Sequence, residues 1–193
     1  PLAAMHGTVG VAPPGGEVRS SLTCDTHGGN LDTPELRAGA TLYLGVNVTG
    51  ALLALGDGHA RQGQGEVCGV GVEVPMHTAL TVEVIKDVVT PWPRIETDAA
   101  IMSVGCARPL EDAFRISQHD LVGWVADLTG LDLLDAYQLV SQAATAPVGN
   151  VVDPNYTMLA RLDKAVLRGA VAYGGAHQRL RQVASPPTPG GRR

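Results

Sequence analysis

Residues 56–66 (GDGHARQGQGE) combine the residue types that bind divalent metals and transfer protons. Asp57, His59 and Glu66 supply two carboxylates and an imidazole, and four glycines allow the backbone to turn tightly around a ligand. We interpret the stretch as a turn in which Asp57 and His59 converge on one ion, followed by a strand that returns Glu66 beside them. The alternative is an ordinary Gly-Asp-Gly turn without a ligand.

A second stretch, residues 27–32 (HGGNLD), is the other candidate part of a site. The backbone N–H groups of Gly28 and Gly29, with the amide of Asn30, can hold the oxygen of a substrate amide. In the alternative interpretation Asn30 and Asp32 form an Asx turn and bond only their own backbone.

Two side chains in the expected strand 66–74 leave alternatives open. Glu73 either adds a second carboxylate to the site or reaches solvent, because a buried glutamate without a partner is costly. Cys68 is either a catalytic nucleophile or a thiol packed inside the strand. The nucleophile would need a lysine, and neither Lys86 nor Lys164 lies in a stretch with the character of a site.

The elements that must position these residues change in type along the chain. Up to residue 106, short apolar segments alternate with glycine and proline turns and predict strands, among them 1–12, 40–55, 66–74 and 78–86. Residues 110–128 and 131–144 carry apolar side chains at helical spacing and predict two amphipathic helices. The fold class is therefore mainly β, sandwich or barrel-like, with an inserted or appended pair of helices, and α+β overall.

Domain organisation follows from the same pattern. Residues 1–176 are expected to form a single β-rich domain, because the length suffices for one substantial core. Residues 177–193 end in a sequence rich in proline, glycine and arginine and are expected to form a disordered tail.

Composition excludes several functional classes. The formal net charge is −5, and no run of Lys or Arg precedes the last few residues, which argues against nucleic-acid binding. No apolar run approaches the ~20 residues of a membrane span. Charged residues make up only 17% of the chain, so much of its surface is expected to lie in a core or against other subunits. Three widely spaced cysteines fit a reducing, cytoplasmic setting.

Taken together, the two stretches resemble the acetamidase/formamidase family of amide hydrolases. The intervening residues 36–55 (LRAGATLYLGVNVTGALLAL) and Glu73 belong to the resemblance, and residues 7–13 (GTVGVAP) and 151–157 (VVDPNYT) extend it over most of residues 7–167. Gly45 stands where the family usually has a proline. Gln64 stands where the family commonly has an aspartate, which removes one carboxylate near the site.

The resemblance implies a cytoplasmic, metal-dependent hydrolase that cleaves the C–N bond of small amides to a carboxylate and ammonia. We expect zinc as the metal, with calcium as the second candidate. The expected metal ligands are Asp57, His59 and Asp32. Glu66 is the expected general base, and Glu66, His59 and Asp57 form the catalytic set, whereas Asn30, Gly29 and Gly28 would bind substrate.

The resemblance also concerns partners. Family members carry a β-rich portion before the segment that matches residues 7–13, so we expect either a homo-oligomer or a partner chain that supplies this portion. The expected ligand is a small amide, with no role for nucleic acid or membrane. The alternative function is a metal-stabilised β subunit or scaffold module without catalysis.

Overall fold

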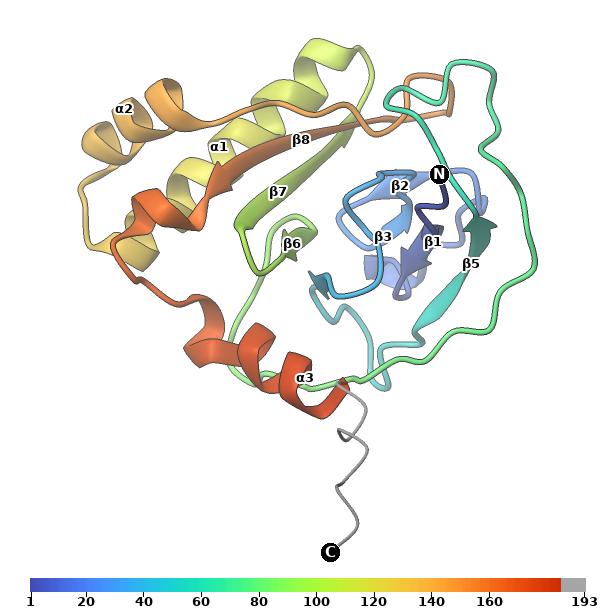
Figure 1. The fold of residues 1–193 in the computed structure, drawn as a ribbon, viewed down its shortest axis with the longest axis horizontal. Helices are drawn as coiled ribbons and strands as arrows, with labels where there is room; N and C mark the ends of the chain where they lie inside the picture. Colours follow the sequence, from blue (N-terminus) through green and yellow to red (C-terminus); the bar gives the residue numbers. More distant parts are fainter. Residues whose placement is uncertain (185–193) are drawn as a thin grey trace, which may run out of the picture.

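A computed structural model of the chain describes residues 1–184, and Figure 1 shows two antiparallel sheets beside a group of helices. The first sheet contains, in spatial order, β2 (Cys24–Asp25), β3 (Gly28–Asn30), β1 (Met5–Gly10) and β5 (Ala54–His59). The second sheet contains, in spatial order, β4 (Thr41–Tyr43), β6 (Arg94–Glu96), β7 (Ala100–Ala107) and β8 (Tyr156–Asp163).

The α-helices of the described residues are α1 (Leu110–Thr129), α2 (Leu133–Ala143) and α3 (Ala176–Ala184). Short 3-10 helices cover Pro14–Gly16, Lys164–Leu167 and Ala172–Gly175. The first two α-helices lie where the sequence predicts them. The side chain of Asp132 caps α2 by accepting the backbone N–H groups of Leu134 and Asp135, each at 2.9 Å. The expected fold class, mainly β with added helices, is confirmed.

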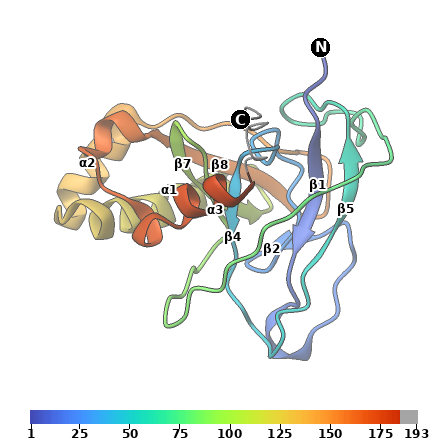
Figure 2. The same ribbon diagram turned by 60° about the horizontal axis from the view of Figure 1, so that its bottom comes forward.

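Strand β7 lies at the centre of the molecule and is covered on both faces. Its residues Met102 and Val104 pack into an apolar cluster with Leu31 of the first-sheet side, whereas Ile101 packs into a second cluster with Trp124 of α1. Figure 2 shows α1 and α2 on one side of β7 and β8, with β1 and β5 on the other. Alternate residues of a strand face opposite sides, and both faces of β7 are covered, so nearly all of its residues are buried. Strand β7 therefore contributes side chains to both apolar clusters.

Several sequence-based expectations are wrong in detail. Residues 54–59 form a strand, β5, in which only Asp57 has a positive φ angle, although we interpret residues 56–59 as a turn from their glycines. No strand forms over 66–71 or over 78–86, although both segments alternate in the manner of strands. A strand requires a hydrogen-bonded neighbour, and local alternation does not supply one.

Residues 177–184, which are expected to belong to a disordered tail, are helical instead. Residues 176–184 form α3, and the His177 side chain is only 1% exposed. Its ring nitrogens lie 2.9 Å from Thr41 Oγ1 and 3.1 Å from Asp98 Oδ1, so α3 is tied to the second sheet. The rest of the expected tail, residues 185–193, lies outside the described residues. None of the helices in residues 1–184 has the length and hydropathy needed to cross a membrane.

Candidate functional site

A small cavity of about 150 Å³ gathers acidic side chains next to the first sheet. Its polar lining consists of Asn30, Asp32, Asp57, His59, Glu66, Glu73 and Asp153. None of the described residues that line it is a lysine or an arginine. The cavity therefore concentrates negative charge without a positive side chain to balance it.

Strand β1 brings the two predicted stretches together. It pairs with β3 on one side and with β5 on the other, so Asn30 and Asp57 lie on strands that flank it. A Cβ atom at Gly7 would collide with Asp32 Oδ1 and Asp57 Oδ2, so only glycine lets these carboxylates close over β1. Two residue stretches separated by some 25 positions thus meet across one strand.

The loop after β5 brings two further carboxylates, those of Glu66 and Glu73, to the cavity. The Glu66 N–H donates to the carbonyl of Gly63 at 3.2 Å in a tight turn. The chain then comes back along β5, because the N–H of Val74 donates to the carbonyl of Gly58 at 2.8 Å. This return places Glu73 opposite His59 in an isolated β-bridge.

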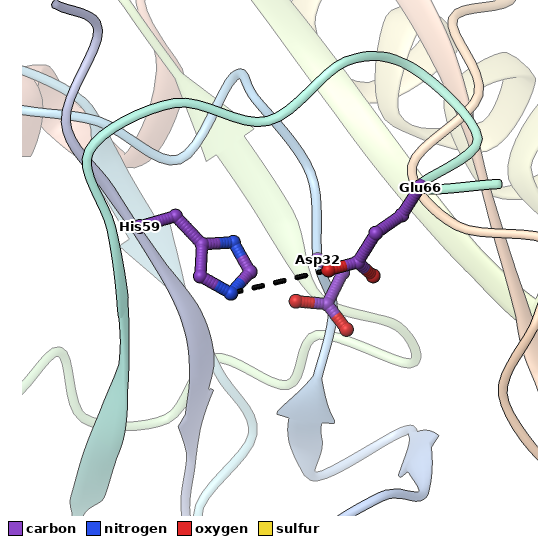
Figure 3. Close-up of side chains that lie close together, drawn as sticks. All are labelled: Asp32, His59 and Glu66. Atoms are coloured by element: carbon purple, nitrogen blue, oxygen red, sulfur yellow. Dashed lines mark ion pairs between the residues drawn. The ribbon is translucent and has the colours of Figure 1, made fainter. Parts of the chain in front are cut away.

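The Nε2 atom of His59 faces the carboxylates of the cavity. It lies 3.0 Å from Glu73 Oε1, 3.2 Å from Asp57 Oδ1 and 3.9 Å from Glu66 Oε1. Figure 3 shows the His59 ring, Asp32 and Glu66 pointing toward one another from three different segments. His59, Asp32 and Glu66 are buried, whereas the Glu73 side chain is half exposed. One face of the cavity is thus closed and the other is open to solvent.

Burial and like charge disturb the ionisation of the inner carboxylates. Burial, followed by repulsion from Glu66, raises the pKa of Asp32 to about 9. Burial also raises the pKa of Glu66, while the nearby His59 acts in the opposite direction. Carboxylates crowded in this way cannot all ionise without a cation.

The donor set fits a divalent cation. Asp32, His59 and Glu66 form one group, and Asp57, His59 and Glu73 form another, each with ligand atoms within 4.8 Å of one another. Asp32 Oδ1 is buried and has no hydrogen-bond partner. A buried acceptor without a donor is costly, and an ion between these groups would satisfy it. One imidazole nitrogen among carboxylate oxygens is a donor set that suits zinc.

Asn30 orients two of the carboxylates. Its amide nitrogen donates to Asp32 Oδ2 at 2.5 Å and to Asp153 Oδ2 at 2.8 Å, and its oxygen accepts from the Thr8 hydroxyl. The side chain of Asn30 therefore uses its hydrogen-bonding groups inside the site.

The backbone of the site is unusual at the carboxylates themselves. Asp32, Asp57 and Glu66 have φ angles of 40°, 57° and 44°. These values lie in the left-handed region that residues with a side chain rarely adopt.

Most of the predicted site residues meet in the cavity, but two do not. Asn30, Asp32, Asp57, His59 and Glu66 all line it. Gly28 and Gly29 do not line it, since both lie in the interior strand β3 and pair with β1 and β2. Their expected contact with substrate stays a prediction.

Sequence reasoning missed other members of the site. Asp153 has no assigned role from the sequence, although it lies in residues 151–157, which belong to the family resemblance. Gln62 lies inside the predicted stretch 56–66, but an amide side chain does not by itself indicate a role, and only the structure shows that it contacts His59. Glu73, for which the sequence allows either a site role or a solvent-exposed one, lies 3.0 Å from His59. Cys68 is exposed and outside the strand in which we expected it to pack.

A larger hollow of about 360 Å³ lies beside β5 and shares Asp57 with the acidic cavity. Its titratable side chain besides Asp57 is His6, whose ring nitrogens lie 3.0 Å from the Gly56 carbonyl and 2.6 Å from the Thr78 hydroxyl. Because both ring nitrogens of His6 already have partners, the hollow offers fewer free reactive groups than the acidic cavity does.

Comparisons with known proteins agree on one group of relatives. The model of the acetamidase/formamidase family matches residues 14–159. An acetamidase from Yersinia enterocolitica superposes with a TM-score of 0.85 at 45% identity, covering 86% of this chain and 50% of the other. An acetamidase from Bacillus halodurans gives 0.83 at 38% identity, covering 87% and 57%.

A predicted acetamidase/formamidase from Thermoanaerobacter tengcongensis gives a TM-score of 0.79 at 35% identity, covering 88% of this chain and 56% of the other. The chain thus spans little more than half the length of the solved structures it matches. A search of curated proteins gave no match.

Proposed function

The chain belongs to the acetamidase/formamidase family, and on that premise we propose that it hydrolyses the C–N bond of small amides, such as formamide or acetamide, to a carboxylate and ammonia. One observation carries the proposal. The Nε2 atom of His59 faces Asp57, Glu66 and Glu73 in a cavity of about 150 Å³, which has room for a small ligand.

His59, Asp32 and Asp57 are the proposed ligands of a divalent ion in this cavity. Zinc is the first candidate, because an imidazole ligand suits it, and calcium the second, because the other ligands are oxygens. When bound, such an ion would polarise the amide carbonyl and lower the pKa of water at the site toward about 7. Asn30 supports the ligand Asp32 rather than binding substrate in this proposal.

Glu66 is the proposed general base. Its side chain is buried at the cavity wall, and burial raises its pKa above the ordinary value of a glutamate. A base works best when its pKa lies near the working pH, so this environment suits proton abstraction from the attacking water. Glu66 would then return the proton to the leaving nitrogen.

The test is the Glu66→Gln variant assayed for ammonia release from formamide and acetamide. We expect turnover to fall by about 10²- to 10⁴-fold, the usual contribution of a general base. The zinc affinity should change much less, because His59, Asp32 and Asp57 remain. The control is Glu111→Gln, an exposed residue in the first turn of α1. Undiminished turnover in Glu66→Gln would remove Glu66 from the role of base.

A second function, a metal-stabilised subunit without catalysis, is favoured by Gln64, which stands where the family commonly has an aspartate and so removes one carboxylate near the site. A chelator that lowers the melting temperature of a chain without amide turnover would support this function. Turnover that a chelator abolishes would support the amidase instead.

We also propose that the chain works in an assembly, either with copies of itself or with a partner chain. Along residues 78–86 the side chains of Leu80, Val82 and Val84 alternate and are 53%, 67% and 70% exposed. A row of exposed β-branched and apolar residues is a surface typical of contact with another chain.

The three cysteines are free, which supports a reducing, cytoplasmic setting.

A further inference from the structure

The buried side chain of Gln62 joins three segments of the site. It is 8% exposed, and its amide nitrogen lies 2.6 Å from the carbonyl oxygen of Asp32 and 3.3 Å from that of Gly149. Its amide oxygen lies 3.0 Å from Nδ1 of His59. Gln62 therefore contacts the histidine, the backbone of an inner carboxylate and the loop that leads to Asp153.

These contacts fix the orientation of the Gln62 amide. Backbone carbonyl oxygens only accept hydrogen bonds, so the group that faces Asp32 and Gly149 must be the NH₂. The opposite orientation would place the amide oxygen against two other oxygens. The Gln62 oxygen consequently faces His59, and it too can only accept.

The amide orientation in turn fixes the tautomer of His59. Because the Gln62 oxygen accepts, Nδ1 of His59 must carry the hydrogen. In a neutral ring this leaves the lone pair on Nε2, the atom that faces Asp57, Glu66 and Glu73. A lone pair that faces carboxylate oxygens is unfavourable on its own and favourable around a cation.

We propose that Gln62 is a positioning residue that holds His59 in the Nδ1–H tautomer and so presents Nε2 as a metal ligand. The same side chain ties His59 to the backbone of Asp32, which sets the separation of two proposed ligands. The tautomer follows from contacts within the protein, whereas the consequence for metal binding rests on the proposed function. Hydrogen bonds to the second nitrogen of a ligating histidine usually change metal affinity by about 10- to 100-fold.

The first experiment measures the tautomer without metal. The protein is labelled with ¹⁵N-histidine, and long-range ¹H–¹⁵N correlations, which show for each ring nitrogen whether it carries a hydrogen, are recorded without metal. The signals of His59 are identified among the six histidines by their loss in a His59→Gln variant. We expect Nδ1 to be protonated in the wild type. In Gln62→Met, which removes both hydrogen-bonding groups, the preference for Nδ1–H should disappear.

The second experiment measures zinc affinity by competition with a chelator of known affinity. We expect Gln62→Met to bind zinc about 10- to 100-fold more weakly than the wild type. The matched control is Gln64→Met, the same substitution two residues away on an exposed side chain. It should retain the tautomer and the affinity.

The outcomes separate the positioning role of Gln62 from the metal binding in the proposed function. A wild-type His59 that carries no hydrogen on Nδ1, with its only ring hydrogen on Nε2, overturns the role of Gln62, even where Gln62→Met fails to fold. An unchanged tautomer and affinity in folded Gln62→Met overturn it as well. A wild type with the expected tautomer that binds no zinc contradicts the metal in the proposed function and leaves the positioning role of Gln62 intact.

Discussion

Three carboxylates of the candidate site are held on strained backbone. Asp32, Asp57 and Glu66 all have positive φ angles, and such conformations cost on the order of 1–3 kcal/mol each. They persist only where the surrounding structure determines them, which means β1 and its neighbours for Asp32 and Asp57, and the tight turn at Gly63 for Glu66. Contacts elsewhere in the fold offset this strain, and the result is an acidic cavity that is already formed before a ligand binds.

We expect Asp32→Asn to stabilise the metal-free protein. The pKa of Asp32 rises from 3.8 unfolded to about 9 folded, so the folded state keeps a proton that the unfolded chain releases. The free energy of unfolding of the wild type should therefore fall as pH rises from about 4 to about 9. Asparagine does not ionise, so Asp32→Asn should flatten this dependence and gain about 1–3 kcal/mol at the alkaline end.

The measurement is urea unfolding in the presence of a chelator at about pH 5 and about pH 9. The control is Asp127→Asn on the exposed side of α1, which should change stability by less than about 0.5 kcal/mol. A wild type that becomes more stable toward pH 9 would contradict the assignment of a buried, protonated Asp32.

The sequence predicts which residues can do chemistry better than it predicts which residues contact one another in the fold. Asp57, His59 and Glu66 can be picked out because their types and spacing fit metal binding. Asp153 cannot, because its contact with Asn30 joins residues 123 positions apart. Gln62 cannot either, since an amide side chain is common and only its position against His59 gives it a role.

Helix α1 packs directly against strand β7. A Cβ atom at Gly105 of β7 would collide with the Ala113 carbonyl of α1, so the helix lies directly on the strand. We expect Gly105→Ala to destabilise the protein by about 1–3 kcal/mol, the usual cost of overpacking. Gly123→Ala on α1 is the matched control, because a Cβ there meets nothing within 4 Å.

Gly123→Ala should stabilise the protein by about 0.5–1 kcal/mol, since alanine is the better helix former. The measurement is the melting temperature of each variant by thermal unfolding. Equal melting temperatures would show that α1 can shift away from β7 at little cost.

Elements were predictable where the local pattern decides them. Helices α1 and α2 follow from apolar spacing and from caps such as Asp132, which are local features. Residues 78–86 alternate like a strand but form none, because no neighbouring strand of the described chain pairs with them. Strand β5 was mistaken for a turn, because glycines at 56 and 58 indicate turns unless β1 lies alongside.

For the whole molecule, the exposed row of Leu80, Val82 and Val84 predicts association. We expect size-exclusion chromatography with light scattering to give a mass above the 20.0 kDa of one chain. The double variant Val82→Thr with Val84→Thr should shift the distribution toward the monomer, because threonine keeps the shape and loses apolar area. A wild type that stays monomeric at all concentrations tested would exclude self-association and leave a partner chain as the occupant.

The distribution of the site along the chain bears on the order of folding. Its side chains come from residues 30–32, 57–66, 73 and 153, so the two ends of the set close a loop of 123 positions. Closing such long loops is slow, and it comes after local helices such as α1 have formed. The cavity is therefore among the last features to be completed. The proposed cation ligands Asp32, Asp57 and His59 all lie between residues 32 and 59, so their part of the cavity can form, and hold a cation, before Asp153 closes it.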